Sequence, residues 1–518
     1  MRFVVLVAVG FGCLAPDGSP PPGGAFDIVE RSTPEITSVT TQRGFAQIRQ
    51  SATVPLVIRG KKFQGTVRVT VGPFFVTLDS VEPHEVHVTV FTFGSVAPGP
   101  LDVSLTAAAG TTTAAGAVEL TPIVVSPTAT DGDGTFQSPT RLCDLESPVG
   151  SGGALLTLLA GTHLCGRVLE VIGGITVQGD PNQPTIVAGT ETGGFGFTIE
   201  FGNRFSTTVF RDLTFAPPVA FASISTSVGS GSLLVERVTS AGTLSAIGDS
   251  LVTVDHYTHD GEGNGIEVSI ASITNSTLRH CGAGDGVVVR PFQNFSSVAL
   301  DHVVVEDCEH GVTVDGQSGA QSSTITNTQF LDNRVGIHIV GGFTQMSDSE
   351  IRNVAPAAPG RAGISIERGD LFVTNTQISG QDVGASISQF NSDGRGGLAG
   401  DGITIEGGRV GVSISGIENS LSLHNSTVRD QTDAAAVIGS VDSSIDFGTS
   451  FSPGNNALSV VSGFVIDDRR RFESLIDKYI QAVGTTLNGF SFDGQTIDGP
   501  AELAPFYRIA DGDSGIQF

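Results

Sequence analysis

Five residues in the middle of the chain form a candidate site for chemistry: Arg279, His280, Asp307, Asp332 and Arg352. Carboxylate oxygens are the ligands that Ca²⁺ prefers in proteins, and arginine pairs with the carboxylate of an anionic sugar. Two aspartates beside two arginines therefore suit calcium together with an anionic sugar. The alternative is an exposed ladder of salt bridges, because opposite charges on neighbouring strands attract one another without any ligand.

Whether these residues meet depends on a repeat between residues 256 and 425. One pattern recurs eight times, with 19 to 27 residues between successive anchor positions. Two and four residues before each anchor the chain is usually apolar, with a polar residue between, which is the alternation of a β-strand. A repeat of this length is typical of one coil of a solenoid, which buries its apolar side by stacking on its neighbours. The anchors are His256, Asn275, His302, Asn327, Asp348, Asn375, Gly402 and Asn425.

Aligning the coils from their anchors without gaps predicts which side chains stack. The third position after the anchor is apolar except at His259, which we interpret as a hydrogen-bonded turn residue rather than a catalytic base. The fifth position puts Asp307 and Asp332 on successive coils, with His280 on the coil before them. At the fourth position after the anchor, the sign of the charge alternates over the first three coils. This position holds Asp260, Arg279, Glu306, Leu331, Arg352, Ser379, Glu406 and Arg429.

A second strand in most coils opens with glycine, as at Gly286, Gly311 and Gly336. Because glycine adopts backbone angles that other residues avoid, we expect it to supply the backbone freedom that each corner needs. The composition agrees with an extended β protein, since the chain has 68 glycines and only 15% charged residues.

The repeat resembles those of the pectate-lyase-like superfamily of right-handed parallel β-helices. The resemblance implies an all-β fold, with the β-helix over residues 127–460 and a C-terminal cap over 461–518. In that superfamily an inward asparagine at a tight turn stacks on its equivalents in adjacent coils. Four anchors match this position, although turn chemistry alone also accounts for them, because asparagine tolerates left-handed backbone. They are Asn275, Asn327, Asn375 and Asn425.

The same resemblance implies a mechanism for the candidate site. In pectate-lyase-like enzymes, calcium acidifies the proton next to a uronate, and an arginine or lysine removes it. On this chain Asp307 and Asp332 would hold the metal, and Arg279 or Arg352 would be the base. Lysine is excluded as the base, because the solenoid has no lysine before Lys478. The clustered aspartates, Gly-His-Gly and Arg-Ile-Lys of polygalacturonase-like enzymes are absent from the sequence.

The two ends of the solenoid show their own patterns. The Asp- and Gly-rich stretch 131–139 is similar to the opening of the first coil in exported β-helix proteins. At the other end, residues 467–480 have apolar residues at helical spacing after an acidic start, which predicts a helical terminal cap.

An N-terminal segment over residues 34–121 has alternating strands at the spacing of a β-sandwich. Its Ile58–Phe63 and Pro98–Val103 stretches match the "I-x-G-x-x-F" and "P-G-x-x-D-V" signatures of the IPT/TIG family of immunoglobulin-like domains. The resemblance implies a small immunoglobulin-like module that spaces, presents or binds, without catalytic residues.

The first residues resemble an export signal. Residues 1–13 have one positive charge, a short apolar run and then Cys13, as in a bacterial lipoprotein signal. Residues 14–33 are rich in Pro and Gly and are typical of a flexible tether. We therefore expect an exported protein, lipidated at Cys13 on the outer membrane or cell surface, or otherwise secreted. Contact with a membrane is expected only through the lipid anchor.

Four further cysteines allow two disulfides in an exported chain. Cys143 and Cys165 lie in the expected first coil. Cys281 and Cys308 each follow their anchor by six residues, so they should stack in neighbouring coils within disulfide range. The alternative for the second pair is two small buried thiols.

Charge and aromatic content restrict the function. A net charge of −26 excludes nucleic acid as a partner and works against a polyanionic sugar unless a metal such as calcium bridges them. Zero Trp and three Tyr leave few rings for sugar stacking. We expect a surface-anchored binding or scaffold protein, adhesin-like, whose partner is an extracellular polysaccharide or a cell-surface component. The alternative is a calcium-assisted polysaccharide lyase or glycoside hydrolase.

Overall fold

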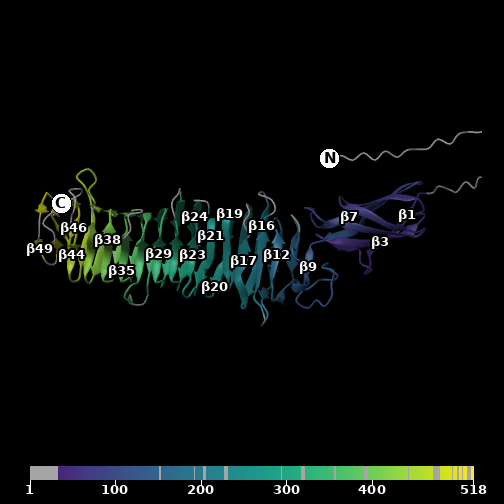
Figure 1. Cartoon of the computed structure of the whole chain (residues 1–518), viewed down its shortest axis with the longest axis horizontal. Helices are drawn as coiled ribbons and strands as arrows, with labels where there is room; N and C mark the ends of the chain where they lie inside the picture. The colour runs from purple at the N-terminus through teal and green to yellow at the C-terminus, as the bar shows by residue number, and fades with distance from the viewer. Residues whose placement is uncertain are drawn as a thin grey trace, which may run out of the picture.

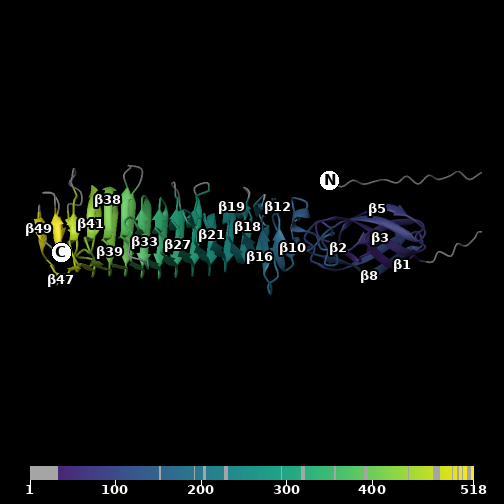
Figure 2. The same cartoon turned by 90° about the horizontal axis from the view of Figure 1, so that it is seen from below.

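The computed structural model describes residues 33–518 except 151–152, 192, 202–205, 227–230, 293–294, 317–320, 355–357, 390–394, 442, 471–478, 493, 499–500, 504–505 and 510–514. A small sandwich at the N-terminal end and a long solenoid lie in line along one axis (Figures 1 and 2). The predicted fold class, an all-β solenoid preceded by a small β-sandwich, is confirmed, and the solenoid has about 12 turns in the described part. Among the described residues, no helix is long and apolar enough to cross a membrane.

The N-terminal module consists of two four-stranded sheets that share one apolar core. The first sheet has the order β1 (Glu35–Thr41), β3 (Thr53–Lys61), β6 (Glu85–Phe91) and β5 (Phe75–Val81). The second has the order β2 (Gln47–Arg49), β8 (Gly110–Thr121), β7 (Gly99–Ala107) and β4 (Thr66–Val71). Only Pro122 separates β8 from the first solenoid strand, so the chain passes directly from one part into the other.

The solenoid has three faces, each a parallel sheet, which we call faces A, B and C. Face A is built from β9 (Ile123–Val125), β10 (Leu155–Leu158), β13 (Thr176–Gln178), parts of β16 (Thr207–Ala216), β18 (Ser232–Ser240), β19 (Thr243–Asp255) and β21 (Ile266–Thr274), then β24 (Ser296–Asp301), β27 (Gln321–Thr326), β30 (Phe343–Ser347), β33 (Gly369–Thr374), β36 (Gly396–Asp401), β39 (Ser420–His424), β42 (Ser444–Asp446), β45 (Tyr479–Gln481) and β51 (Gly515–Gln517).

Face B has short strands, and face C follows it in each coil. Face B is built from β11 (Gly161–Leu164), β14 (Thr185–Ala188), the ends of β16 and β18, β20 (Thr258–Asp260), β22 (Thr277–Arg279), β25 (Val304–Glu306), β28 (Gln329–Leu331), β31 (Glu350–Arg352), β34 (Gln377–Ser379), β37 (Thr404–Glu406), β40 (Thr427–Gln431), β43 (Ala457–Val460) and β46 (Thr486–Leu487). Face C is built from β12 (Val168–Ile172), β15 (Phe195–Glu200), β17 (Val219–Thr226), the starts of β19 and β21, β23 (Asp285–Val289), β26 (His310–Val314), β29 (Val335–Ile339), β32 (Ala362–Ile366), β35 (Val383–Gln389), β38 (Val410–Ile417), β41 (Ala434–Val441), β44 (Phe464–Asp468) and β50 (Tyr507–Ile509).

The predicted register of the coils is confirmed in the strand pairing. On face A, Ile273 pairs with Leu300, and Leu300 with Ile325. On face B, His259 pairs with Leu278 and is as fully buried as the apolar residues that follow it in the column. These inward columns make one continuous core along the tube, as a solenoid requires.

The anchors lie at the corner between faces A and B, the anchor corner, where all eight have left-handed backbone. The expectation that the anchor asparagines point inward is wrong, because Asn275, Asn327, Asn375 and Asn425 are exposed. The residue after each of them is a buried hydroxyl, as at Ser276. Left-handed backbone therefore explains the asparagines, and the next residue supplies the inward hydrogen bond.

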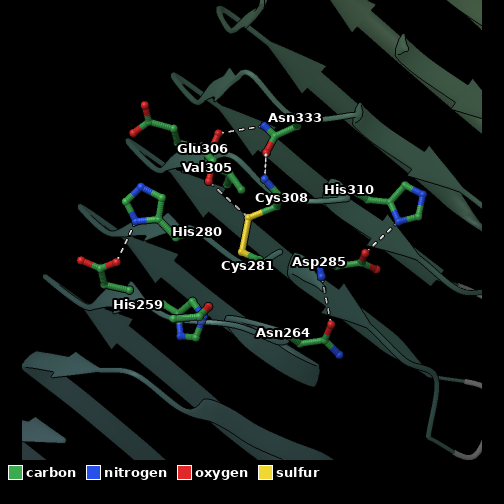
Figure 3. Close-up of a disulfide and its surroundings, with 12 residues drawn as sticks. His259, Asn264, His280, Cys281, Asp285, Val305, Glu306, Cys308, His310 and Asn333 are labelled. Atoms are coloured by element: carbon green, nitrogen blue, oxygen red, sulfur yellow. Dashed lines mark hydrogen bonds and ion pairs between the residues drawn. A yellow bond between two sulfur atoms is a disulfide. The ribbon is translucent and has the colours of Figure 1, made fainter. Parts of the chain in front are cut away.

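Inward amides do occur, at the corner between faces B and C, which we call the second corner (Figure 3). The Asn333 side chain accepts a hydrogen bond from the Cys308 amide at 2.9 Å and donates to the Val305 carbonyl at 2.9 Å. Asn353 donates to Gln381 on the next coil at 2.8 Å. The Asn333 amide thus satisfies backbone groups that the corner would otherwise bury without partners, whereas Asn353 bonds the side chain of the next coil.

The glycines that open the face C strands serve a different purpose from the one expected. Gly286, Gly311 and Gly336 do not have left-handed backbone. Instead, a Cβ at Gly311 would meet the Gly336 carbonyl oxygen and a Phe330 ring carbon, each at 2.4 Å. Glycine is therefore required by close packing between coils and not by backbone freedom.

Parallel pairing continues beyond residue 460, where we expected a cap to begin. Strand β44 pairs with β41, and β45 pairs with β42. The helix expected over 467–480 is wrong at both ends, since Asp467 and Asp468 lie in β44 and residues 479–481 form β45; its middle, 471–478, lies outside the described residues. The chain closes with the short antiparallel strands β47 (Phe490–Ser491), β48 (Thr496–Asp498) and β49 (Ala501–Leu503). Near the other end, the only described helix is the 3-10 turn η1 (Leu142–Asp144).

Candidate functional site

The structure places the predicted site residues along the edge of face B and the second corner. Arg279 pairs in register with Asp260 on one side and Glu306 on the other. Its guanidinium Nη2 lies 2.8 Å from the Asp260 carboxylate, and the His280 ring nitrogen Nδ1 lies 2.8 Å from the same carboxylate. The His280 hydrogen bond, followed by Arg279, lowers the pKa of Asp260. Arg279, one of the two candidate bases, and its neighbour His280 therefore both contact Asp260, which had no role in the predicted site.

Asp307 and Asp332 occupy equivalent positions on successive coils, both with left-handed backbone. The Asp332 carboxylate accepts a hydrogen bond from the Val354 amide at 2.7 Å. Arg352 pairs with Glu350 on its own strand at 3.0 Å. In the described part of the chain, no three His, Cys, Asp or Glu side chains gather at a metal-binding distance. The calcium site at Asp307 and Asp332 stays a prediction for a titration to test.

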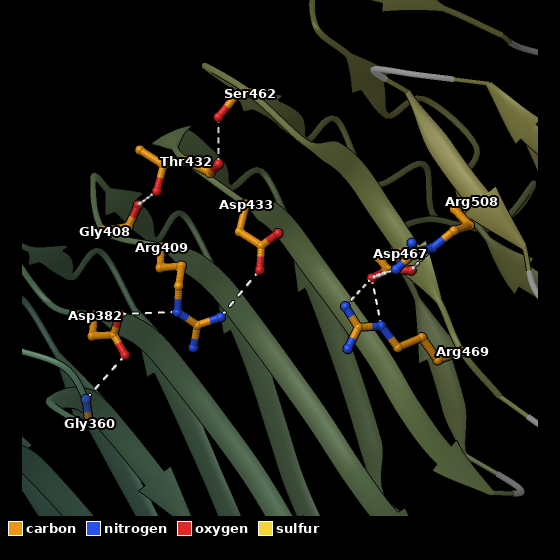
Figure 4. A network of polar contacts seen from close by, with 10 residues as sticks. All are labelled: Gly360, Asp382, Gly408, Arg409, Thr432, Asp433, Ser462, Asp467, Arg469 and Arg508. Carbon is orange, nitrogen blue, oxygen red and sulfur yellow. Dashed lines mark hydrogen bonds and ion pairs between the residues drawn. The ribbon is translucent and has the colours of Figure 1, made fainter.

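Salt bridges between neighbouring coils recur farther along face B and the second corner. Arg409 lies between two carboxylates, 3.3 Å from Asp382 on one coil and 3.2 Å from Asp433 on the other (Figure 4). Arg429 pairs with Glu406 at 2.9 Å. The charged columns thus form the kind of ladder that we weighed against a metal site, and solvent exposure makes each rung a weak contribution to stability.

The predicted cysteine pairs come together. Cys143 and Cys165 are joined by a disulfide that links η1 to the end of β11, and Cys281 and Cys308 by one that spans two coils at the second corner (Figure 3). Cys13 lies outside the described residues.

The anchor corner carries a second polar ladder that repeats every two coils. Asn275 donates a hydrogen bond to the Asp255 carboxylate at 2.9 Å, and Asn327 donates to Asp301 at 2.8 Å. Hydrogen bonds from Asn327, His302 and Thr326 lower the pKa of Asp301 to about 2. The aspartates are therefore fixed by the next coil, which gives them a structural role.

Sequence reasoning missed a carboxyl pair on face C. Glu170 on β12 and Glu200 on β15 share a hydrogen bond, which raises the pKa of Glu170. Glycosidase carboxyl pairs stand about 5 to 9.5 Å apart, so that a sugar fits between them. Two carboxyl groups in hydrogen-bond contact leave no such space.

Sequence reasoning also missed an aromatic ridge on face A. The outward residues of β27, β30, β33, β36 and β39 are mostly Ser, Thr, Ala and Gly. Phe343 and Phe372 interrupt them, with ring centres 5.8 Å apart. The Phe372 side chain is 50% exposed although it lies in the middle of a sheet. The signal was present in the sequence, as an aromatic residue in an outward column three residues before an anchor.

A groove runs along each side of Phe372. The first, about 360 Å³, is lined by Thr324, Gln345, Ser347 and Thr374 besides Phe372. The second, about 300 Å³, is lined on its far side by Ser420, Ser422, Ser444 and Asp446. Its floor is low because Gly397 and Ala399 are small. A Cβ at Gly397 would meet Asp370 Oδ1 at 2.3 Å, so any larger residue would disturb this groove.

The face A surface has acidic and hydroxyl groups but no lysine or arginine in the strands from β27 to β42. Asp370 and Asp446 line the second groove. His424 lies 3.5 Å from Asp446 at its rim. The surface can accept hydrogen bonds from hydroxyls and donate hydrogen bonds to them, and these strands have no lysine or arginine to neutralise an anionic ligand.

Comparisons with known proteins add little to this geometry. No protein-family model matches the chain, and no curated protein matches it. A solved structure with a similar fold is the catalytic unit of the thermostable GH87 alpha-1,3-glucanase from Streptomyces thermodiastaticus strain HF3-3. It is 11% identical, and the match covers 90% of this chain and 88% of that chain with a TM-score of 0.33. At that TM-score the likeness carries no argument about function.

Proposed function

We propose that the protein is an exported, surface-anchored binding protein whose solenoid holds a neutral polysaccharide along face A. The observation that carries the proposal is the Phe372 ridge, half exposed between two parallel grooves. The C–H face of a sugar ring packs on an aromatic ring, and its hydroxyls need hydrogen-bonding partners on both sides.

The surroundings of Phe372 fit an extended chain of sugars. Each groove offers hydroxyl or carboxylate groups at intervals set by the spacing between strands, about 4.8 Å. The two grooves lie on consecutive coils along the tube axis, so a chain that crosses the ridge would contact both. A linear polymer can thus make several equivalent contacts on a surface that hardly has to move.

A neutral polymer fits better than an anionic one. Face A lacks arginine and lysine over these strands, and the whole chain has a net charge of −26. An anionic polymer would be repelled, and a bridging metal would be needed to hold it. The carboxylates at Asp370 and Asp446 instead suit sugar hydroxyls, which donate hydrogen bonds to them.

The anchoring part of the proposal rests on the N-terminal sequence. A lipid on Cys13 would hold the chain at the outer membrane or cell surface, and an immunoglobulin-like module of the IPT/TIG type would space the solenoid from it. The position of the module at the N-terminal end of the tube agrees with this role (Figure 1). Radiolabelled palmitate incorporated by wild type and not by Cys13→Ala would test the anchor.

Affinity electrophoresis in gels containing neutral glucans or uronate polymers tests the binding site. We expect retardation by a neutral polymer and a loss of about tenfold in affinity in Phe372→Ala, since one stacked ring contributes about 1 to 1.5 kcal/mol. Phe451, which is 99% exposed, gives the matched control Phe451→Ala, which should bind like wild type. Equal binding by wild type and Phe372→Ala would overturn the proposal.

Asp307 beside Asp332 on successive coils favours the lyase as a second candidate. Incubation with uronate polymers and calcium would then give unsaturated products, and Arg279→Ala would abolish them. Calorimetry of wild type and Asp307→Ala with calcium measures metal binding separately from catalysis. Negligible heat in both proteins, with no unsaturated product, would remove this candidate.

A further inference from the structure

The junction between the N-terminal module and the solenoid contains a cavity of about 490 Å³, well inside the size range of small-molecule sites. Its walls come from both parts of the molecule. The module contributes Thr41 at the end of β1, Arg49 in β2 and Phe93, which follows β6 by two residues. The start of the solenoid contributes Asp133, Thr135 and Glu146. The cavity lies at the N-terminal end of the tube, whereas the two grooves beside Phe372 lie on coils toward its C-terminal end.

Arg49 supplies charge to this cavity. Its guanidinium lies against the 131–139 segment, since a Cβ on Gly134 would stand 3.0 Å from Nη1. Among the residues that the structure describes, the guanidinium makes neither a hydrogen bond nor an ion pair shorter than 4 Å. Burial lowers the pKa of Arg49, although Glu146 and Asp133 act in the opposite direction. The guanidinium is half-buried and lines the cavity, so its N–H donors can meet an acceptor that enters it.

Thr41 supplies a second, independent sign of a missing partner. It is 7% exposed and lines the cavity, and its hydroxyl oxygen Oγ1 is buried without a hydrogen-bond partner in the described part of the chain. Such groups are rare in folded proteins because each raises the free energy of the native state. This unpaired hydroxyl and the Arg49 guanidinium, which line the same cavity, mark a position where oxygen atoms of a ligand would be held.

The acceptors in the cavity define the rest of the ligand. Asp133 uses Oδ1 to accept from the Thr135 amide and hydroxyl, at 3.1 and 2.9 Å, and its other oxygen is not used in those bonds. Glu146 is exposed at the rim. Carboxylates can only accept hydrogen bonds, so they call for ligand hydroxyls, while Arg49 calls for a ligand carboxylate. Phe93 adds an apolar wall for the C–H face of a ring.

We infer that the junction cavity is a binding site for a small sugar acid, with the ligand carboxylate on Arg49 and its hydroxyls on Thr41, Asp133 and Glu146. The site is independent of face A and of the polymer proposed there. Because both parts of the molecule line it, an occupant also ties the module to the solenoid.

Calorimetry of the full chain with D-glucuronate and D-glucose tests the site, since these two probes differ only in the carboxylate. We expect glucuronate to bind at least about tenfold more tightly than glucose, and added salt to weaken glucuronate alone. Arg49→Gln keeps hydrogen-bond donors without the charge and should reduce glucuronate binding to the level of glucose. Thr41→Val removes only the hydroxyl and should weaken both sugars.

The control is Phe372→Ala, which should leave glucuronate binding unchanged and so separates this site from face A. Equal affinity for the two sugars, or no heat with either, would overturn the inference. If Arg49→Gln does not fold, the salt dependence and the preference between the two sugars in wild type still decide it.

Discussion

At the scale of single residues, His259 shows how a polar side chain can be buried in an otherwise apolar column. It lies where other coils have Leu278 or Val305, and it is fully buried. Its ring nitrogen Nε2 lies 2.8 Å from the Gly261 carbonyl, and Nδ1 has no partner in the described part of the chain. Burial lowers the pKa of His259, with that carbonyl opposing the effect. The ring is therefore neutral in the folded protein and has no second partner that would make it a base.

This pKa shift makes stability depend on pH. In the unfolded chain His259 takes up a proton near pH 6.5, and the folded state resists that proton until a lower pH. Folding stability is thus lost as the pH falls below about 6.5, by about 1.4 kcal/mol for each unit by which the pKa is lowered. Urea unfolding of His259→Leu should show a smaller loss between pH 8 and pH 5 than wild type. An unchanged loss would contradict this, and His84→Gln, at an exposed histidine of the module, serves as control.

At the scale of elements, strand alternation and the anchor spacing predicted most of the solenoid. The sequence of apolar residues two before and three after each anchor was sufficient, because equivalent positions must stack if the core is to be continuous. The direction of the anchor asparagines could not be predicted that way. Asn275 can adopt left-handed backbone whether its side-chain amide points inward or outward. Ser276 takes the inward position with its hydroxyl, so the Asn275 amide points outward.

The side-chain contacts around the candidate site could not be predicted from the sequence either. Register correctly put Arg279 next to both Asp260 and Glu306, but register cannot say which carboxylate a long flexible side chain will choose. Phe372 was overlooked because a single aromatic residue in an outward column is unremarkable until the small residues of the neighbouring coil, Gly397 and Ala399, reveal a groove.

The last turns of the solenoid depend on a buried ion pair. The inward column that contains Ile438 and Ile509 has Asp468 between them. Arg470 meets its carboxylate with two hydrogen bonds of 2.9 and 2.8 Å, and both side chains are fully buried. The pair therefore interrupts the apolar column with charge close to its end.

Removing one partner of this pair should be costly. Arg470→Ala leaves a buried carboxylate without its counter-charge, and we expect a loss of about 3 to 5 kcal/mol in the free energy of unfolding. The double variant Asp468→Leu with Arg470→Met continues the apolar column and should recover most of that loss. Chemical unfolding followed by tryptic digestion of the C-terminal coils measures both. A double variant as unstable as the single one would show that the pair is needed for more than charge balance.

At the scale of the whole molecule, the module and the solenoid are joined by buried amides as well as by the chain itself. Gln50 is fully buried at the junction, accepts a hydrogen bond from the Leu155 amide at 2.8 Å and donates one to the Val96 carbonyl. Gln47 accepts one from the Gln137 amide at 3.2 Å. With only Pro122 between the last strand of the module and the first of the tube, these bonds fix the direction in which the solenoid projects.

Gln50→Ala should let the orientation of the solenoid relative to the module vary, without unfolding either part. The Leu155 amide would be left buried without an acceptor, at about 1 to 3 kcal/mol, and the module core and the tube core would keep their own contacts. Small-angle X-ray scattering should then show a broader distribution of distances than the rod of wild type, while the thermal unfolding of the tube stays the same. Gln42→Ala, at an exposed glutamine of the same module, is the matched control. A variant that scatters like wild type would show that the short chain connection alone keeps the two parts in line. The module could then act as a rigid spacer for face A without a buried amide at the junction.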